Sequence, residues 1–216
     1  MRIMGIAAIR PTKYTSKGNK EHLKYPYLLR GLRIDYPDQV WGTDITYIKA
    51  KGIWFYLTAI MDWHSRYVVS WKLSRTLTPD FCANSLREAL AKGRFPEIHN
   101  SDQGSQFTAK EYISILKEHP GIRISMDGRG RCFDNIFTER LWRSVKYEEV
   151  YLKDYQSFEE AEEELARYFE TYNNRRLHSS LGYRPPAEVY FQEKSRLAPE
   201  ELTNRIYLKN TILVSE

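Results

Sequence analysis

Three acidic side chains stand in sequence settings where a carboxylate could bind a metal ion. Asp102 follows a short run with the pattern of a strand and precedes Gly104 by two residues. An acid at the carboxyl end of a strand can project from a rigid element into a cleft, and a glycine lets the backbone turn away. Asp44 lies inside the run W-G-T-D-I-T-Y-I, and Glu139 lies inside a stretch of helical periodicity. Two aspartates and a glutamate are sufficient ligands for Mg²⁺, which needs neither histidine nor cysteine.

Each of these acids also has an ordinary structural explanation. Asp44 could be a solvent-facing strand residue, although aspartate disfavours strand interiors, and Asp102 could belong to a simple turn. Glu139 could be a solvated helix residue, because Arg143 lies four residues on and could form an ion pair with it. Three further acids compete for a ligand position: Asp62, Asp127 and Asp134.

The elements that must position these acids are expected in the order three strands, helix, strand, helix, strand, helix. The expected strands are residues 40–48, 53–61, 66–73, the run just before Asp102, and residues 122–125. Helix starts are indicated by three capping patterns: Thr78 with Pro79, Thr108 with Glu111, and Ser157 with Glu160. Three antiparallel strands followed by parallel ones joined through helices are typical of an α/β protein with a mixed sheet.

A helix is expected from about residue 133 to residue 147, and its two faces differ in character. The apolar face is predicted to hold Phe133, Ile136, Phe137, Leu141 and Val145. The polar face is predicted to hold Asn135, Glu139, Arg143 and Lys146. Trp142 lies near the polar face, whereas the other tryptophans (Trp41, Trp54, Trp63 and Trp71) are expected mostly in the core.

Length and composition indicate one main domain with extensions. The chain has 216 residues, of which 42% are hydrophobic, so it can bury a core. We expect an N-terminal arm over residues 1–39, a core over residues 40–175 and a C-terminal extension over residues 176–216. The net charge of +5 permits a polyanionic partner without demanding one.

Cysteine content and hydropathy favour a soluble, cytoplasmic protein. Cys82 and Cys132 are too few for a disulfide framework and lack zinc-type spacing, so we interpret both as packing residues in a reducing compartment. The longest apolar stretches fall well short of the roughly 18 residues needed to span a bilayer.

Taken together, the segments around Asp44, Asp102 and Glu139 resemble the catalytic core of DDE transposases and retroviral-type integrases. The resemblance is strongest to the second-frame protein of the insertion-sequence-3 family, and it extends from about Tyr25 to about Tyr190. It includes the run Y-N-N-R-R-L-H-S-S-L-G-Y-R-P-P-A-E-V-Y, which is similar to that family's usual ending.

This resemblance implies a ribonuclease-H-like fold, with a mixed five-stranded sheet flanked by helices, and a site for two Mg²⁺ ions that Mn²⁺ could replace. Asp44 would bridge both ions, Asp102 would complete one site, and Glu139 would complete the other. The segment from residue 103 to residue 138 is about one residue longer than in the family pattern. The proline in the run K-E-H-P-G-I-R could accommodate the extra residue in a loop.

Six residues are candidate contacts to DNA: Gln103, Ser105, Arg129, Arg131, Arg143 and Lys146. The loop after Asp102 could let backbone and amide groups approach a phosphate, or it could simply form a tight turn. The basic residues could contact the DNA backbone, or they could be solvated surface charges. His178 matches a family motif, and a structural hydrogen-bonding role is the favoured interpretation.

The function implied by the resemblance is cleavage of DNA at the ends of an insertion sequence and transfer of the freed 3′-hydroxyl to a second phosphodiester. Partners would be the element's ends, the target DNA and at least one further copy of the chain. A helix-turn-helix protein from an upstream reading frame is one candidate partner. Two alternatives are a ribonuclease-H-like nuclease that cuts without joining, and an inactive DNA-binding remnant of a transposase.

Overall fold

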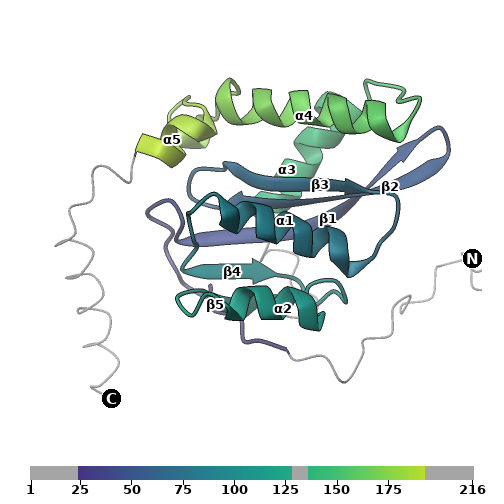
Figure 1. Cartoon of the computed structure of the whole chain (residues 1–216). Coiled ribbons are helices and arrows are strands. Elements are labelled where there is room, and N and C mark those ends of the chain that lie inside the picture. The colour runs from purple at the N-terminus through teal and green to yellow at the C-terminus, as the bar shows by residue number, and fades with distance from the viewer. Residues whose placement is uncertain (1–23, 128–135, 193–216) are drawn as a thin grey trace, which may run out of the picture.

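The computed structural model describes residues 24–127 and 136–192. These parts form a five-stranded mixed sheet in the order β3-β2-β1-β4-β5, with helices on both faces (Figure 1). The strands are β1 (Val40–Ala50), β2 (Ile53–Asp62), β3 (Val68–Ser74), β4 (Ile98–Ser101) and β5 (Arg123–Met126). Strands β1 to β3 form an antiparallel meander, and β4 and β5 run parallel to β1. The expected fold class and order of elements are therefore confirmed.

Five α-helices cover the sheet in the described parts of the chain. They are α1 (Pro79–Ala91), α2 (Lys110–Lys117), α3 (Ile136–Val145), α4 (Phe158–Asn174) and α5 (Pro186–Gln192). A π-helical turn, η3 (Lys146–Val150), follows α3, and a short 3₁₀ turn, η4 (Ser179–Leu181), precedes α5. No helix among the described residues combines the length and the apolar character that crossing a membrane would require.

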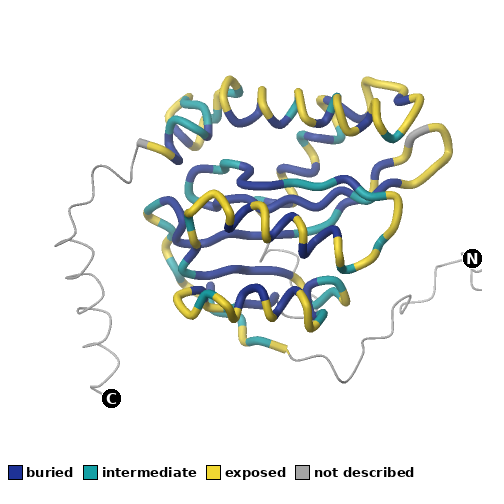
Figure 2. Tube along the Cα trace, in the orientation of Figure 1, coloured by how far each residue is buried: buried dark blue, intermediate teal, exposed yellow. Residues whose placement is uncertain are grey.

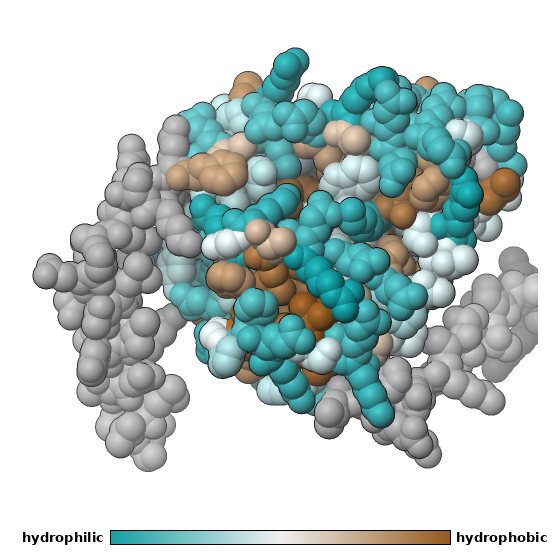
Figure 3. Space-filling model, viewed as in Figure 1, coloured by the Kyte–Doolittle hydropathy of each residue, from teal (hydrophilic) through white to brown (hydrophobic). Residues whose placement is uncertain are grey.

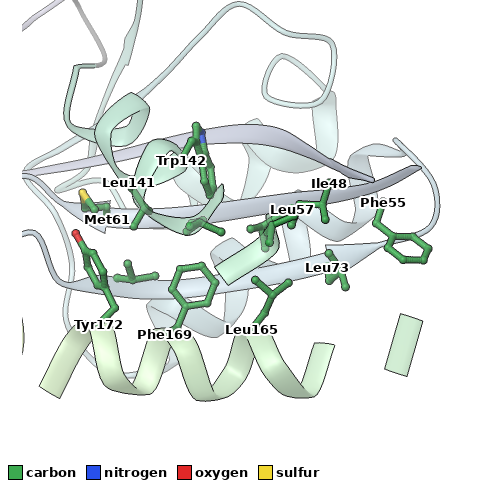
Figure 4. Close-up of a cluster of buried hydrophobic side chains, with 14 of the residues drawn as sticks. Ile48, Phe55, Leu57, Met61, Leu73, Leu141, Trp142, Leu165, Phe169 and Tyr172 are labelled. Atoms are coloured by element: carbon green, nitrogen blue, oxygen red, sulfur yellow. The ribbon is translucent and has the colours of Figure 1, made fainter. Parts of the chain in front are cut away.

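The alternation of side chains along β1 divides the interior into two cores. Even-numbered positions such as Val40 and Ile48 pack with residues of α3 and α4, whereas Trp41 and Ile45 pack with residues of α1 and α2. Figure 4 shows the first of these cores, with Phe169 and other side chains of α4 pointing toward the sheet. The central strands are buried along most of their length (Figure 2). In Figure 3 the visible face is mostly hydrophilic, and apolar residues show between α1 and α2.

The helix starts agree only in part with the capping patterns. Ser157 accepts a hydrogen bond from the backbone N–H of Glu160 at 3.1 Å, as expected. The capping box at Thr108 is wrong, because α2 begins after Ala109. The Thr108 hydroxyl instead donates to the carbonyl of Gly104 at 2.9 Å and so closes the preceding loop.

The β1–β2 hairpin is long, and its far end has only one neighbouring strand. Lys51 and Gly52 both have positive φ angles, which suits a tight two-residue turn. Pairing between β1 and β2 runs from Trp41 to Ala50, whereas pairing between β1 and β4 covers only Val40–Gly42. Figure 1 shows the hairpin reaching beyond the rest of the sheet. Beyond Gly42, β1 therefore has a free edge within the described part of the chain.

Residues that are distant in the sequence are joined by polar contacts around Asp38, just before β1. The Asp38 carboxylate forms an ion pair with Arg94 at 2.7 Å and accepts a hydrogen bond from the Tyr190 hydroxyl at 2.7 Å. The indole of Trp41 donates to the same carboxylate at 3.1 Å. Segments far apart in sequence thus meet at one buried acid. The division of the chain at residues 39 and 175 stays a prediction.

Asp62, at the end of β2, is a second buried acid with a structural role. It has no exposed surface. Its carboxylate accepts hydrogen bonds from the backbone N–H and hydroxyl of Ser65, at 2.7 and 2.6 Å, and from the backbone N–H of Asp38 at 2.7 Å. Burial raises the pKa of Asp62 to about 6, although these hydrogen bonds oppose the shift.

This raised pKa predicts a pH-dependent contribution of Asp62 to stability. A carboxyl whose pKa rises on folding favours the folded state below pH 3.8, and this contribution is lost as the pH rises through about 6. Asp62→Asn does not titrate. We expect the unfolding free energy of the wild type, minus that of Asp62→Asn, to fall by up to about 3 kcal/mol between pH 4 and pH 7. Urea denaturation across that range measures the difference, and a constant difference would contradict the prediction.

Candidate active site

The pairing of β1 with β4 places two of the predicted acids side by side. Gly42 and Asn100 are partners in the parallel register. Asp44 and Asp102 each lie two residues further on, Asp44 within β1 and Asp102 directly after the end of β4. If the alternation of side chains continues from the last pair, both acids lie on the same face of the sheet. That face is the one covered by α3, since Val40 on the same side of β1 packs in a cluster with Leu141.

Helix α3 brings the third acid to this face. The helix packs on the sheet through its buried residues Leu141, Trp142 and Val145, and it carries Glu139 in its exposed first turn. The negative charges of Asp102 and Glu139 both raise the pKa of Asp44. The structure therefore brings the three predicted acids within electrostatic reach of one another.

Close packing between β1 and the start of α3 fixes where Glu139 lies. A side chain on Gly42 would come within 2.0 Å of the indole nitrogen of Trp63, so only glycine lets that ring lie against β1. The Trp63 ring meets Phe137 edge to face at 5.4 Å, and the Arg66 guanidinium lies 3.5 Å from the centre of the Phe137 ring. Phe137 is two residues before Glu139, so these contacts position the first turn of α3.

Asp44 is held in one orientation by two hydrogen bonds. Its Oδ1 accepts from the backbone N–H of Ile45 at 2.8 Å, and its Oδ2 accepts from the indole N–H of Trp142 at 3.0 Å. Burial is the main cause that raises the pKa of Asp44 to about 6, and both hydrogen bonds act in the opposite direction. A larger fraction of this acid than of an ordinary aspartate is thus protonated near neutral pH.

Asp102 is held by the loop that follows β4. Its Oδ1 accepts a hydrogen bond from the backbone N–H of Gly104 at 2.8 Å. A side chain on Gly104 would come within 2.8 Å of the same oxygen. Partial desolvation raises the pKa of Asp102 although the residue keeps an exposed surface, and the bond from Gly104 opposes the shift. The loop therefore presents this carboxylate to solvent while fixing one of its oxygens.

The donor set fits a hard divalent cation. Carboxylate oxygens are the preferred ligands of Mg²⁺ and Mn²⁺. A cation would favour the ionised form of Asp44, whose pKa is raised mainly by burial and also by the charges of Asp102 and Glu139. In residues 24–127 and 136–192, no three His, Cys, Asp or Glu side chains converge closely enough to hold one ion by themselves. Mg²⁺ is commonly bound by one or two carboxylates together with substrate phosphates, so a complete protein cage is not required.

The competing acids are placed differently. Asp62 is buried in the hydrogen bonds described above, and Asp127 accepts a hydrogen bond from the amide of Asn100 at 2.9 Å. Asp134 lies outside the described residues. Pro120 lies in the connection between α2 and β5, so the segment expected to absorb an extra residue is indeed a turn.

Four of the six candidate DNA contacts lie among the described residues. The Gln103 amide donates to the carbonyl of Asp127 at 2.9 Å, and the Ser105 hydroxyl donates to the side chain of Gln106 at 3.2 Å. Arg143 is exposed on α3, and Lys146 is half-buried at the start of η3. Arg129 and Arg131 lie outside the described residues. Contact of any of these residues with DNA stays a prediction.

Side-chain burial corrects several expectations about the helix and the aromatic residues. Trp142 is 6% exposed rather than near a solvated face, and Ile136, expected on the apolar face, is 37% exposed. Trp54, expected in the core, is 52% exposed. The ring of His178 packs edge to face on Tyr172 at 5.1 Å, which is a structural contact, but its buried Nε2 has no hydrogen-bond partner among the described residues, so the expected hydrogen-bonding role is not seen.

The role of Trp142 is the functional feature that the sequence interpretation missed. A buried indole N–H is a donor that needs an acceptor, and Trp142 follows Glu139 by three residues, almost one turn later. That spacing was the available signal, because it places the indole of Trp142 near the helix face that carries Glu139. A hydrogen-bond acceptor for the indole could therefore be expected near the acids.

The mixed five-stranded sheet flanked by helices is the fold of an integrase core, and the comparisons agree. One family model described as "Integrase core domain" matches residues 35–132, and a second with the same description matches residues 120–186. With the relatives described next, these matches establish that the chain belongs to the DDE transposases of the insertion-sequence-3 family.

Three relatives illustrate the match. A 31 kDa uncharacterized protein of insertion element IS600 from Shigella sonnei is 35% identical over 73% of this chain and 58% of its own length. The transposase for insertion sequence element IS904 from Lactococcus lactis is 32% identical over 87% of this chain and 76% of its own length. Transposase InsF for IS3A from Escherichia coli is 33% identical over 74% of this chain and 55% of its own length. The chain thus spans between about half and three quarters of these relatives.

Solved structures support the fold. The HTLV-2 integrase catalytic core domain, in complex with magnesium, aligns with a TM-score of 0.59 and 17% identity over 74% of this chain and 100% of that domain. An integrase chain of the simian T-cell lymphotropic virus intasome aligns with a TM-score of 0.65 and 19% identity over 82% of this chain and 62% of that chain. Both carry the ribonuclease-H-like fold.

The indole of Trp142 predicts a test of how Asp44 is oriented. Trp142→Phe keeps most of the ring packing but removes the hydrogen bond to Asp44, so we expect Mg²⁺ affinity to fall roughly tenfold. The measurement is the Mg²⁺ concentration that gives half of the metal-induced rise in melting temperature. Trp71→Phe is the matched control, because Trp71 stacks on Phe169 away from the acids. Equal Mg²⁺ dependence in both variants would contradict the assigned role.

Gly104 allows a second test of the site's geometry. In Gly104→Ala the new methyl group would crowd the Asp102 carboxylate and displace it, so we expect Mg²⁺ affinity to fall by about tenfold or more with little change in metal-free stability. Gly121→Ala is the control, since a side chain there would meet no atom within 4 Å. The same titration measures both variants. A Gly104→Ala protein that binds Mg²⁺ like the wild type would show that the loop geometry does not matter.

Proposed function

We propose that this chain is the catalytic core of an insertion-sequence transposase that cleaves DNA at the element's ends and joins the freed 3′-hydroxyl to target DNA. The observation that carries the proposal is the placement of Asp44 on β1 and of Asp102 directly after β4, the neighbouring parallel strand, with the charge of Glu139 within reach of Asp44. Family membership makes this chemistry the expected one. Cleavage and joining are both attacks of an oxygen nucleophile on a phosphodiester, so one site serves both steps.

Three carboxylates supply what such a reaction needs from the protein. Two divalent cations bound there would neutralise charge on the attacked phosphate and on the leaving oxygen, and would activate a water or a 3′-hydroxyl. In this proposal Asp44 serves both ions, Asp102 completes one site and Glu139 completes the other. Trp142 and the backbone of Ile45 keep Asp44 oriented before substrate binds. No serine or tyrosine nucleophile is required, and the protein forms no covalent bond to DNA.

The partners in this proposal are DNA and further copies of the chain. The HTLV-2 integrase core with magnesium was solved in a dimeric form, and the simian virus protein was solved within an intasome. We infer that this chain likewise acts as at least a dimer, because transposition joins two ends of one element. A helix-turn-helix protein from an upstream reading frame would supply recognition of those ends.

The decisive experiment incubates the protein with a labelled duplex carrying the repeat that flanks its own gene, in Mg²⁺ or Mn²⁺. Wild-type protein should yield both cleaved and joined products. Asp102→Asn and Glu139→Gln should each lower both by at least about a hundredfold, because one metal ligand is lost. Glu162→Gln, which alters an exposed glutamate on α4, is the matched control and should leave both products unchanged.

Each other outcome has a distinct meaning. Cleavage without any joined product would identify a nuclease rather than a transposase. If Asp102→Asn is inactive and Glu139→Gln still joins DNA, another acid completes the site. DNA binding without metal-dependent cleavage by the wild type would favour an inactive remnant, provided that the upstream-frame protein, when added, does not restore cleavage.

A further inference from the structure

A second hollow lies at the β1–β2 hairpin, outside the group of acids. This hairpin groove has a volume of about 630 Å³, within the size range of small-molecule sites. Its lining includes four aromatic residues, Tyr47, Trp54, Tyr56 and Tyr151, and two basic residues, Lys49 and Lys146. In the described part of the chain, no carboxylate lines it.

Three of the four aromatic side chains of the groove have half or more of their surface exposed to solvent. Tyr47 is 50% exposed, Trp54 is 52% exposed and Tyr151 is 64% exposed. Tyr47 pairs with Tyr56, and Lys49 pairs with Trp54, across the two antiparallel strands, so these four side chains share one face of the hairpin. The rings of Tyr47 and Trp54 meet edge to face at 6.4 Å, which leaves ring surface open to a ligand. The hairpin tip is exposed in Figure 2.

Positive charge surrounds these rings. The Lys49 ammonium lies 5.6 Å from the centre of the Trp54 ring, and Lys146 lines the opposite wall on η3. Arg143, one turn earlier on α3, lies over the Tyr147 ring at 5.9 Å. Aromatic faces beside lysine and arginine are what proteins use to bind single-stranded DNA, because bases stack on the rings while phosphates meet the cations.

The position of the groove relative to the acids follows from two rigid elements. Along β1, Tyr47 is three residues from Asp44, a distance of about 10 Å, and this odd spacing turns the two side chains to opposite faces of the strand. The lining of the groove passes from one face to the other, because it also includes Ile48, which lies on the face of Asp44, and Lys146 on η3. Along the helix, Lys146 is seven residues from Glu139, which is two turns, about 10 Å, on the same face. The edge of β1 between the two places has no neighbouring strand within the described residues. A DNA strand advances about 3.4 Å per nucleotide, so the groove lies about three nucleotides from the acids.

We propose that the hairpin groove stacks an unpaired DNA base about three nucleotides from the phosphate at the acids, with Lys49 and Lys146 against its flanking phosphates. The site would hold the DNA end open, since stacking on the rings offsets the loss of base pairing. This inference rests on the proposed function for the location of the phosphate. The stacking itself can be measured without any catalysis.

The first test measures binding of an oligothymidylate of about eight nucleotides to the full chain in EDTA, by tryptophan fluorescence. All five tryptophans lie in the described part of the chain, and Trp54 alone is exposed, so a stacked base should quench mainly its emission. Trp54→Ala and Tyr47→Ala should each weaken binding roughly tenfold, as measured by anisotropy of a labelled oligonucleotide. Phe95→Ala is the matched control, because Phe95 is 46% exposed and lies outside the groove.

The second test places 2-aminopurine at each of the first few positions of a duplex end. Wild-type protein should raise its fluorescence most at about the third nucleotide from the scissile phosphate, and Trp54→Ala should abolish that rise. Wild-type affinity in both groove variants, or a rise at no position, would overturn the inference. So would a changed oligomeric state of Trp54→Ala with unchanged DNA binding, which would make the groove a protein interface.

The two proposals fail in different ways. Asp102→Asn should bind oligothymidylate like the wild type, because the groove does not involve Asp102. Trp54-dependent binding without any cleavage by the wild type would refute the proposed function and leave the groove in place. Cleavage that depends on Asp102, together with Trp54-independent binding, would refute the groove alone.

Discussion

The placement of three carboxylates within electrostatic reach of one another, one of them largely buried, is the constraint on which the rest of this structure depends. Asp44, Asp102 and Glu139 come from a central strand, the loop that follows a neighbouring strand and a helix. The pairing of β1 with β4 ends two residues before Asp44 and Asp102, while packing of α3 against β1 sets the third acid. Burial is the main cause of the raised pKa of Asp44, the charges of Asp102 and Glu139 add to it, and a bound cation would favour the ionised form again.

The supporting contacts act on orientation rather than on charge. Trp142 and Ile45 each donate to a different oxygen of Asp44, and Gly104 donates to Asp102. A metal site gains precision when its ligands cannot rotate, because little reorganisation remains when the ion arrives. Two glycines also help to fix the geometry of the site, because neither has a side chain. Gly42 admits the Trp63 ring against β1, and Gly104 leaves room for the Asp102 carboxylate.

Much of the fold could be predicted from the sequence, since strand alternation and helix periodicity are local signals. The three acids were chosen with the help of the family resemblance, and their role at the site stays a prediction. The register of β1 against β4 could not be predicted, because it depends on contacts between distant segments. The orientation of α3 was predicted only approximately. A helical wheel shows which residues share a face, but it does not show where burial stops, so Trp142 was placed too near solvent and Ile136 too near the core. The burial of Trp54 was predicted wrongly because a strand pattern does not show where a hairpin extends beyond the rest of the sheet.

The shortness of β4 has a consequence for how the chain behaves on its own. Past Gly42, β1 continues to Ala50 with one side unmatched by any strand in the described residues. Such an edge offers rows of backbone donors and acceptors to any extended segment, including the same edge of another molecule. Lys49 and the bulky Tyr47 make flat edge-to-edge pairing unfavourable, which is a common protection for exposed strands. Substitutions that make this edge smaller and more apolar would therefore be expected to turn it into a site of self-association.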